Sequence, residues 1–161
     1  MITLQKDKSF LSNYENSVNC EWLETNGLGG YASSTLNCCN TRRYHGLLVA
    51  AVVPPADRMV LVNKLDEVMV IDNSRYELGC NNYGDVISPQ GFAFIEEFKK
   101  DLFPHFYYKA GGVEIKKSIA MVHSENTTVI SYEVLKAEKE FMLELMPLIS
   151  DRGHHELTHA N

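Results

Sequence analysis

The fold is decided by residues 113–121, which read VEIKKSIAM. Apolar residues there alternate with polar or small ones, and Lys117 is the one break in the pattern. A period of two is typical of a β-strand with one buried face. The same period recurs at 130–135 and 141–146. Short links precede or separate these segments, at residues 110–112, 124–126 and 137–139. Links of this length suit antiparallel hairpins, which predicts a β-meander in the second half of the chain.

The first half of the chain carries longer apolar runs that also predict strands. Residues 46–53 form one such run, which stops at Pro54-Pro55, a pair without ladder donors. Separate strands are expected at 59–62 and 68–71, followed by a turn and a returning strand at 75–78. The stretch from Gly79 to Gly91 is expected to be the longest loop.

No segment combines a helical apolar stripe with capping residues, so little helix is expected. About ten short strands with regular turn signals predict an all-β fold, an antiparallel two-sheet β-sandwich. The sequence shows no internal repeat and no interdomain linker. Residues 1–161 are therefore interpreted as a single domain.

Composition limits the classes of partner. The chain has 161 residues, of which 45% are hydrophobic and 22% charged, and a formal charge of −6. That charge argues against general binding of nucleic acid, and no apolar run is long enough to cross a membrane. The four cysteines lack the spacing of a zinc site, which favours reduced thiols and a cytoplasmic location. No cofactor is indicated.

A dense stretch of special residues begins at Trp22, the only tryptophan, and continues through Asn26 to Gly27, Gly29 and Gly30. The glycines lack the Gly-Lys-Ser/Thr ending of a phosphate loop, and no helix pattern follows them. They are instead expected to form a structural turn between two strands, where positive φ angles and close approach are needed.

The run Arg42-Arg43-Tyr44-His45 follows shortly after. Guanidinium groups and an aromatic ring are suited to binding sugars. If the run is extended, Arg42 and Tyr44 lie on one face and Arg43 and His45 on the other. The alternative is that some of these side chains form ion pairs with nearby carboxylates. The residues alone leave both interpretations open.

Catalytic groups are not evident. Glycoside cleavage needs two carboxylates flanking the bond, but Asp66-Glu67 and Glu96-Glu97 are neighbours on strands and point to opposite faces. These four are expected at the surface, solvated or in salt bridges. Residues 155–159, HELTH, match a bare metalloprotease pattern through His155, Glu156 and His159, without a third ligand. No metal site is predicted.

Two motifs nevertheless carry a family likeness: residues 21–33, EWLETNGLGGYAS, and residues 40–50, NTRRYHGLLVA. They resemble the N-terminal domain of archaeal- and bacterial-type glycogen debranching enzymes, the amylo-α-1,6-glucosidases. The likeness extends over nearly all of the chain from about residue 15. It departs at residues 152–155, RGHH, where the family has Arg-Asp-aromatic-His.

The resemblance implies a supersandwich-like N-terminal domain that precedes a catalytic (α/α)6-barrel holding the carboxylate pair. This chain is then a non-catalytic domain, inactive alone, that braces the barrel and contacts α-glucan such as glycogen or maltooligosaccharide. The residues assigned to glucan contact or to the barrel-facing surface are Trp22, Asn26, Arg42, Arg43, Tyr44 and His45. The alternative is a stand-alone carbohydrate-binding or protein-interaction module. Without a covering domain, exposed apolar surface would favour a homodimer.

Overall fold

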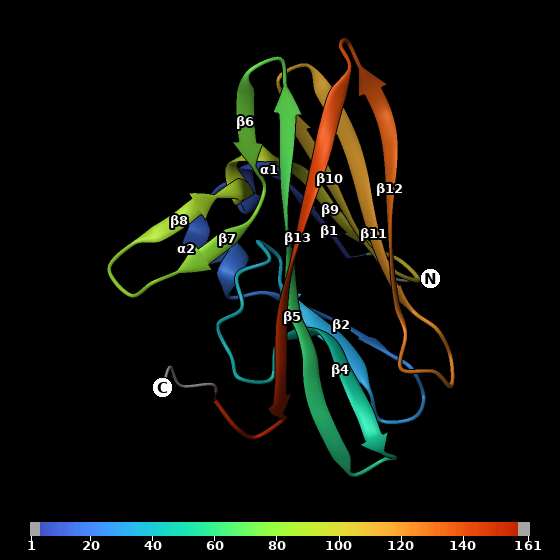
Figure 1. Cartoon of the computed structure of the whole chain (residues 1–161). Coiled ribbons are helices and arrows are strands. Elements are labelled where there is room, and N and C mark those ends of the chain that lie inside the picture. Colours follow the sequence, from blue (N-terminus) through green and yellow to red (C-terminus); the bar gives the residue numbers. More distant parts are fainter. Residues whose placement is uncertain (1–3, 158–161) are drawn as a thin grey trace.

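The computed structural model describes residues 4–157, and two antiparallel sheets dominate it (Figure 1). The first sheet has the order β1-β9-β10-β11-β12, and the second has the order β13-β5-β4-β3-β2 with β6 paired to β5. Strands of the first sheet are β1 (Leu4–Asp7), β9 (Ile95–Lys100), β10 (Pro104–Ala110), β11 (Val113–Met121) and β12 (Thr128–Ala137). Those of the second are β2 (Glu21–Thr25), β3 (Tyr31–Thr35), β4 (Gly46–Val53), β5 (Asp57–Ile71), β6 (Ser74–Glu77) and β13 (Phe141–Gly153). The predicted β-sandwich is confirmed.

Helix is scarce, as predicted. Helices α1 (Lys8–Leu11) and α2 (Tyr14–Val18) have four and five residues, and η1 (Gly91–Phe94) is a single 3-10 turn. Asp7 and Asn13 cap the two α-helices, each accepting a backbone N–H three residues on. Such short segments depend on packing against the sheets rather than on their own helical stability.

Two predictions about the middle of the chain were wrong. The strands expected at 59–62 and 68–71 are parts of the continuous fifteen-residue β5. The loop expected between Gly79 and Gly91 contains a short hairpin, β7 (Cys80–Asn82) and β8 (Ile87–Gln90), which projects from the body of the sandwich (Figure 1). In β5 the charged residues between the apolar runs are buried in ion pairs, so they do not interrupt the strand.

The core lies between the two sheets and is rich in aromatic side chains. Phe98 and Phe106 pack edge to face with ring centroids 4.9 Å apart, and Trp22 meets Phe106 at 6.3 Å. In β11 every second residue is buried, including Lys117. The break in the sequence pattern therefore does not break the structural alternation, because Lys117 points inward like its apolar neighbours.

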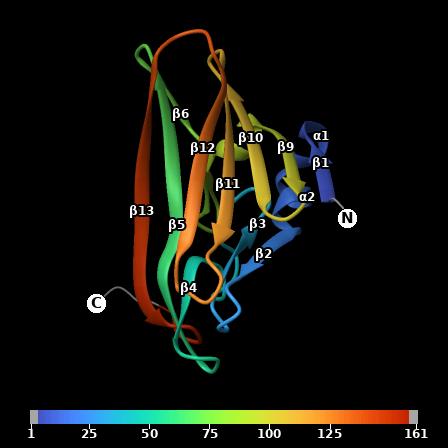
Figure 2. The same cartoon turned by 90° about the vertical axis from the view of Figure 1, so that its right-hand side faces the viewer.

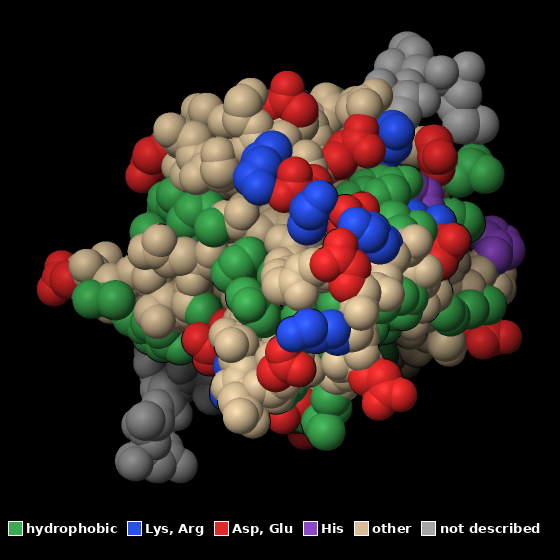
Figure 3. Space-filling model, turned by 90° about the horizontal axis from the view of Figure 1, so that it is seen from above, with side chains coloured by type: hydrophobic (Ala, Val, Ile, Leu, Met, Phe, Trp, Pro, Cys, Tyr) green, Lys and Arg blue, Asp and Glu red, His purple; other side chains and the backbone are tan. Residues whose placement is uncertain are grey.

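One end of the sandwich gathers the turns between β5 and β6, β10 and β11, and β12 and β13. Ion pairs brace them: Lys109 with Glu114 at 2.8 Å, Lys136 with Glu138 at 2.7 Å, and Lys139 with Asp72 at 2.6 Å. Viewed from above, cationic and anionic side chains are interspersed rather than separated by sign (Figure 3). This end presents a mixed-charge surface, not a basic one.

Candidate functional site

The glycine-rich turn between β2 and β3 folds around Asn26, which is fully buried. Its side-chain oxygen accepts from the N–H groups of Leu28 at 2.9 Å and Gly30 at 3.0 Å. Gly27 and Gly29 have φ angles of +78° and +100°, which side chains other than glycine rarely adopt. A Cβ on Gly30 would lie 2.6 Å from the Asn26 amide nitrogen. The geometry of the turn is thus set by Asn26 and the three glycines.

The same turn is connected to two distant segments through Asn126. The Asn26 amide nitrogen donates to the Glu125 carbonyl at 2.9 Å and to the Asn126 side-chain oxygen at 3.1 Å. Asn126 in turn exchanges hydrogen bonds with the backbone of Ala51, at 2.9 Å and 2.8 Å. These bonds join the β2–β3 turn, the β11–β12 turn and β4.

Trp22 and His45 are also interior residues, each 2% exposed. His45 lies 3.2 Å from the Glu21 carboxylate, and its Nδ1 accepts from the Thr41 N–H at 3.1 Å. Burial lowers the pKa of His45, against the opposing effect of Glu21. Trp22, His45 and Asn26 are therefore buried and not at the exposed surface. Contact with a ligand is considered below only for Arg42, Arg43 and Tyr44.

The segment 41–45 is a turn and not the extended run that the sequence suggested. The His45 N–H donates to the Arg42 carbonyl at 3.0 Å, and β4 begins only at Gly46. The predicted alternation of faces is therefore wrong. Instead, Arg42 points outward and pairs with Glu21 at 2.6 Å. For this residue, the alternative prediction of an ion pair with a nearby carboxylate is confirmed.

Arg43 and Tyr44 contact the segment that follows β13. The rings of Tyr44 and His154 lie 4.7 Å apart, and Arg43 donates to the His155 carbonyl at 3.0 Å. Arg152 reaches back to the Arg43 carbonyl at 2.5 Å. We call this group the Tyr44–His154 clasp; its members are Tyr31, Arg43, Tyr44, Arg152, His154 and His155. No local sequence pattern predicts the clasp, because its two halves are more than a hundred residues apart.

The clasp has a defined hydrogen-bond order. The Tyr31 hydroxyl donates to the Tyr44 carbonyl at 2.7 Å and lies 2.8 Å from His154 Nε2. With the Tyr31 proton used on the carbonyl, His154 Nε2 is the donor to the Tyr31 oxygen. Burial lowers the pKa of His154, and the neighbouring His155 and the guanidinium of Arg58 act in the same direction.

A surface hollow of about 450 Å³ adjoins the clasp. Its lining combines guanidinium groups, amides and hydroxyls with an apolar rim: Asn40, Thr41, Arg42, Arg43, Asn63, Leu148, Ile149, Ser150, Arg152 and Leu157. We call it the arginine hollow. Hydrogen-bond donors beside apolar surface are suited to a hydroxylated ligand.

Buried carboxylates occur elsewhere, but they are neutralised. Asp66 and Glu67, expected at the surface, are 9% and 2% exposed. Asp66 pairs with Lys64 at 2.8 Å, while Glu67 pairs with Lys117 across the sandwich. Each carboxylate has its own cation, so the two do not form an acid/base pair. The feature of the sequence that could have indicated this buried pair is Lys117, the one residue that breaks the apolar alternation.

Within residues 4–157, no group of three or more His, Cys, Asp or Glu side chains is placed to hold a metal ion. His159, part of the HELTH pattern, lies outside the described residues. The four cysteines are all unpaired thiols. Among the described helices, none has the length and apolar character to cross a bilayer.

Comparison with models of known protein families gives a match. Residues 20–161 match the family model described as glycogen debranching enzyme N terminal. Neither the curated proteins nor the solved structures contain a match. The matched range includes both turns and every residue of the clasp.

Proposed function

Because the chain belongs to the family of glycogen debranching enzyme N-terminal domains, we propose that it braces the catalytic region of such an enzyme and contacts α-glucan beside it. The observation that carries the bracing role is an uncovered apolar surface on the edge strands β12 and β13. The arginine hollow supports the glucan contact. The catalytic carboxylates are assigned to the other region of the enzyme.

Strands β12 and β13 are each the outermost strand of a sheet and are joined by the turn at 138–140 (Figure 2). Their exposed apolar side chains form what we call the edge band: Val129, Val134, Leu135, Met142, Leu145, Met146, Leu148 and Ile149. Ile149 is 69% exposed and Met142 61%. Long apolar edge strands are normally covered, because unpaired backbone and apolar surface promote association.

A groove runs into the sandwich beside this band. It has a volume of about 190 Å³ and is lined almost entirely by apolar side chains: Leu47, Leu48, Val62, Leu65, Thr128, Ile130 and Pro147. The groove and the edge band together favour a protein partner with an apolar surface. In a debranching enzyme, the catalytic region is the partner that the family implies.

The arginine hollow supports sugar contact for a different reason. Arg42 keeps 65% of its side chain exposed while paired with Glu21, so its remaining donors face solvent. The clasp holds Arg43 and Arg152, which both line the hollow, so it fixes part of the wall. A preformed wall lowers the entropy lost when a flexible glucan binds.

The bracing role is tested by substitutions in the edge band, with this domain and the catalytic region expressed as separate chains. Leu145→Lys is expected to weaken association with the catalytic region, because it places a charge in the band. Leu23→Lys on β2 is the matched control, since Leu23 is 51% exposed and Leu145 47%. Equal association of both variants, measured by sedimentation of the separately expressed regions, would contradict the role.

Glucan contact is tested by calorimetric titration of the chain with maltooligosaccharide. Arg42→Ala is expected to weaken binding about tenfold, whereas Arg75→Ala is expected to leave it unchanged. Arg75 is the matched control because it is an exposed arginine paired with a carboxylate, Glu144, at 2.7 Å. Failure of the unaltered chain to bind at millimolar sugar would refute the contact and leave the bracing role standing.

The alternative, a stand-alone carbohydrate-binding or protein-interaction module, makes a different prediction. Such a module would bind glucan without affinity for a catalytic region, or would cover the edge band with a second copy of itself. Glucan binding by the chain together with no affinity for a separately expressed catalytic region would favour this alternative.

A further inference from the structure

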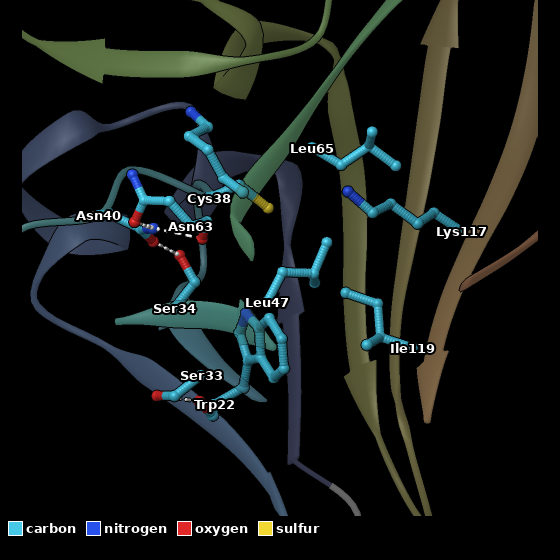
Figure 4. Close-up of a pocket in the computed structure, with 11 residues that line it drawn as sticks. Trp22, Ser33, Ser34, Cys38, Asn40, Leu47, Asn63, Leu65, Lys117 and Ile119 are labelled. Atoms are coloured by element: carbon cyan, nitrogen blue, oxygen red, sulfur yellow. Dashed lines mark hydrogen bonds between the residues drawn. The ribbon is translucent and has the colours of Figure 1, made fainter. Parts of the chain in front are cut away.

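A small hollow lies between the two sheets and is lined by residues of both (Figure 4). Trp22 enters it from β2, and Lys117 and Ile119 enter from β11 on the opposite sheet. The centre of a water molecule can explore about 20 Å³ in it. About 10–15 Å³ by this measure is enough for one water molecule, so the hollow has room for one water-sized species.

Two hydrogen-bond donors lie on this hollow. Trp22 is 2% exposed, and its indole Nε1 has no hydrogen-bond partner among the described residues. The Lys117 ammonium group, 3% exposed, pairs with Glu67, whose carboxylate also accepts from the Tyr132 hydroxyl at 2.6 Å. An ammonium group has three N–H donors, so one ion pair leaves capacity for another acceptor.

Ser33, Ser34 and Asn40, which also line the hollow, are already engaged. The Ser33 hydroxyl donates to the Trp22 carbonyl at 2.9 Å, and the Ser34 hydroxyl donates to the Asn40 side-chain oxygen at 2.7 Å. The Asn40 amide donates to Asn63, at 2.8 Å to its carbonyl and 2.9 Å to its side-chain oxygen.

Lys64, the second lysine of the lining, is held by groups that do not line the hollow. Its ammonium contacts the Cys80 carbonyl at 2.8 Å, the Asn81 side-chain oxygen at 2.9 Å and Asp66 at 2.8 Å. The lining therefore has donors to spare and calls for an acceptor.

We propose that this hollow is a binding site for one single-atom hydrogen-bond acceptor, held by the Trp22 indole N–H and the Lys117 ammonium. A water oxygen and a halide ion share this chemistry. Phosphate and carboxylate groups do not fit the volume. The bound atom links β2 of one sheet to β11 of the other and completes the hydrogen bonding around the buried Lys117–Glu67 pair.

The test uses the full chain and the indole N–H resonance, which is unique because Trp22 is the only tryptophan. Bromide replaces acetate at constant ionic strength while nitrogen–proton spectra are recorded. A saturable shift of the indole resonance identifies a halide. A rotating-frame cross-peak from the indole proton to water, unchanged by bromide, identifies a bound water. Absence of both would overturn the proposal.

Variants identify the second donor. Lys117→Met with Glu67→Gln removes both charges together, so no unpaired buried charge remains. It is expected to weaken bromide binding at least tenfold or to abolish the water cross-peak. Ser33→Ala is the control, because its hydroxyl is used on the Trp22 carbonyl. An unchanged indole signal in the double variant would refute the role of Lys117, and if that variant does not fold, the unaltered chain alone decides.

Discussion

The turn at 26–30 and the turn at 41–45 look alike in sequence, since both are dense in polar and conformationally special residues. In the structure they differ in where their polar groups are used. Asn26 makes all of its hydrogen bonds inside the chain, to backbone and to Asn126. The second turn buries only His45 and leaves Arg42 facing solvent. A turn whose polar side chain makes all its hydrogen bonds within the chain is thus structural, whereas a turn that leaves donors facing solvent is available to a ligand.

The largest effect is expected for Asn26→Ala. The substitution leaves two N–H groups of this turn and two acceptors of the β11–β12 turn without Asn26 as partner, at a cost of about 3 kcal/mol in the free energy of unfolding. Urea denaturation measures it. Asn73→Ala, in the exposed β5–β6 turn, is the control, with less than about 0.5 kcal/mol expected. Similar losses for both would mean that the first turn is not structural.

Gly29→Ala is expected to cost about 2 kcal/mol. The added Cβ would lie 2.8 Å from the Pro55 carbonyl oxygen, at a φ of +100°. Gly84→Ala separates the two causes, because Gly84 has a φ of +91° but no atom within 4 Å of the added Cβ. Its cost should be about 1 kcal/mol, from backbone strain alone. Thermal unfolding of the two variants measures both losses of stability. Equal losses would show that the contact with Pro55 adds no cost beyond backbone strain.

The second turn should respond to pH through the clasp. Burial lowers the pKa of His154 from 6.5, so the unfolded chain takes up the proton first. Its contribution to stability is therefore full above pH 6.5 and lost as the pH falls through the lowered value in the folded chain. A loss of about 0.5 kcal/mol is expected between pH 7.5 and pH 5.

His154→Phe should reduce this pH dependence while keeping the ring stacked on Tyr44. Burial lowers the pKa of His45 too, so part of the loss of stability at low pH remains in that variant. Denaturant midpoints at the two pH values provide the measurement. A variant with the same pH dependence as the unaltered chain would show that His154 does not contribute.

The smallest effect on stability is expected for Arg42→Ala. Its ion pair with Glu21 is exposed, and such pairs contribute less than about 0.5 kcal/mol. Chemical denaturation should barely detect the change, although glucan binding is expected to fall. A stability loss comparable to that of Asn26→Ala would erase the distinction between the two turns.

Sequence reasoning succeeded where the pattern was local. The alternation in 113–121 specified β11 and its buried face, because each residue of a strand points opposite to the next. It failed on β5, where Lys64, Asp66 and Glu67 interrupt the apolar runs. Their burial depends on partners such as Lys117, fifty residues away in the other sheet, and no local pattern encodes that pairing.

The candidate site was predicted in part. The sequence pointed to 42–45, but it gave the wrong backbone, because a turn closed by His45 and Arg42 replaces the extended run. It could not place Trp22 inside, since nothing in the sequence distinguishes an interior indole from one that stacks on a sugar. It missed the clasp because His154 meets Tyr44 only through the pairing of β13 with β5.

The length of β5 has a consequence for how such a chain can vary. One strand pairs with β13 along one edge and with both β4 and β6 along the other. Deleting one residue near Asn63 would turn every following side chain to the opposite face, exposing apolar groups and separating Glu67 from Lys117. We therefore expect changes of chain length to be tolerated in places such as the projecting β7–β8 hairpin, where an added residue shifts no partner strand of the sandwich.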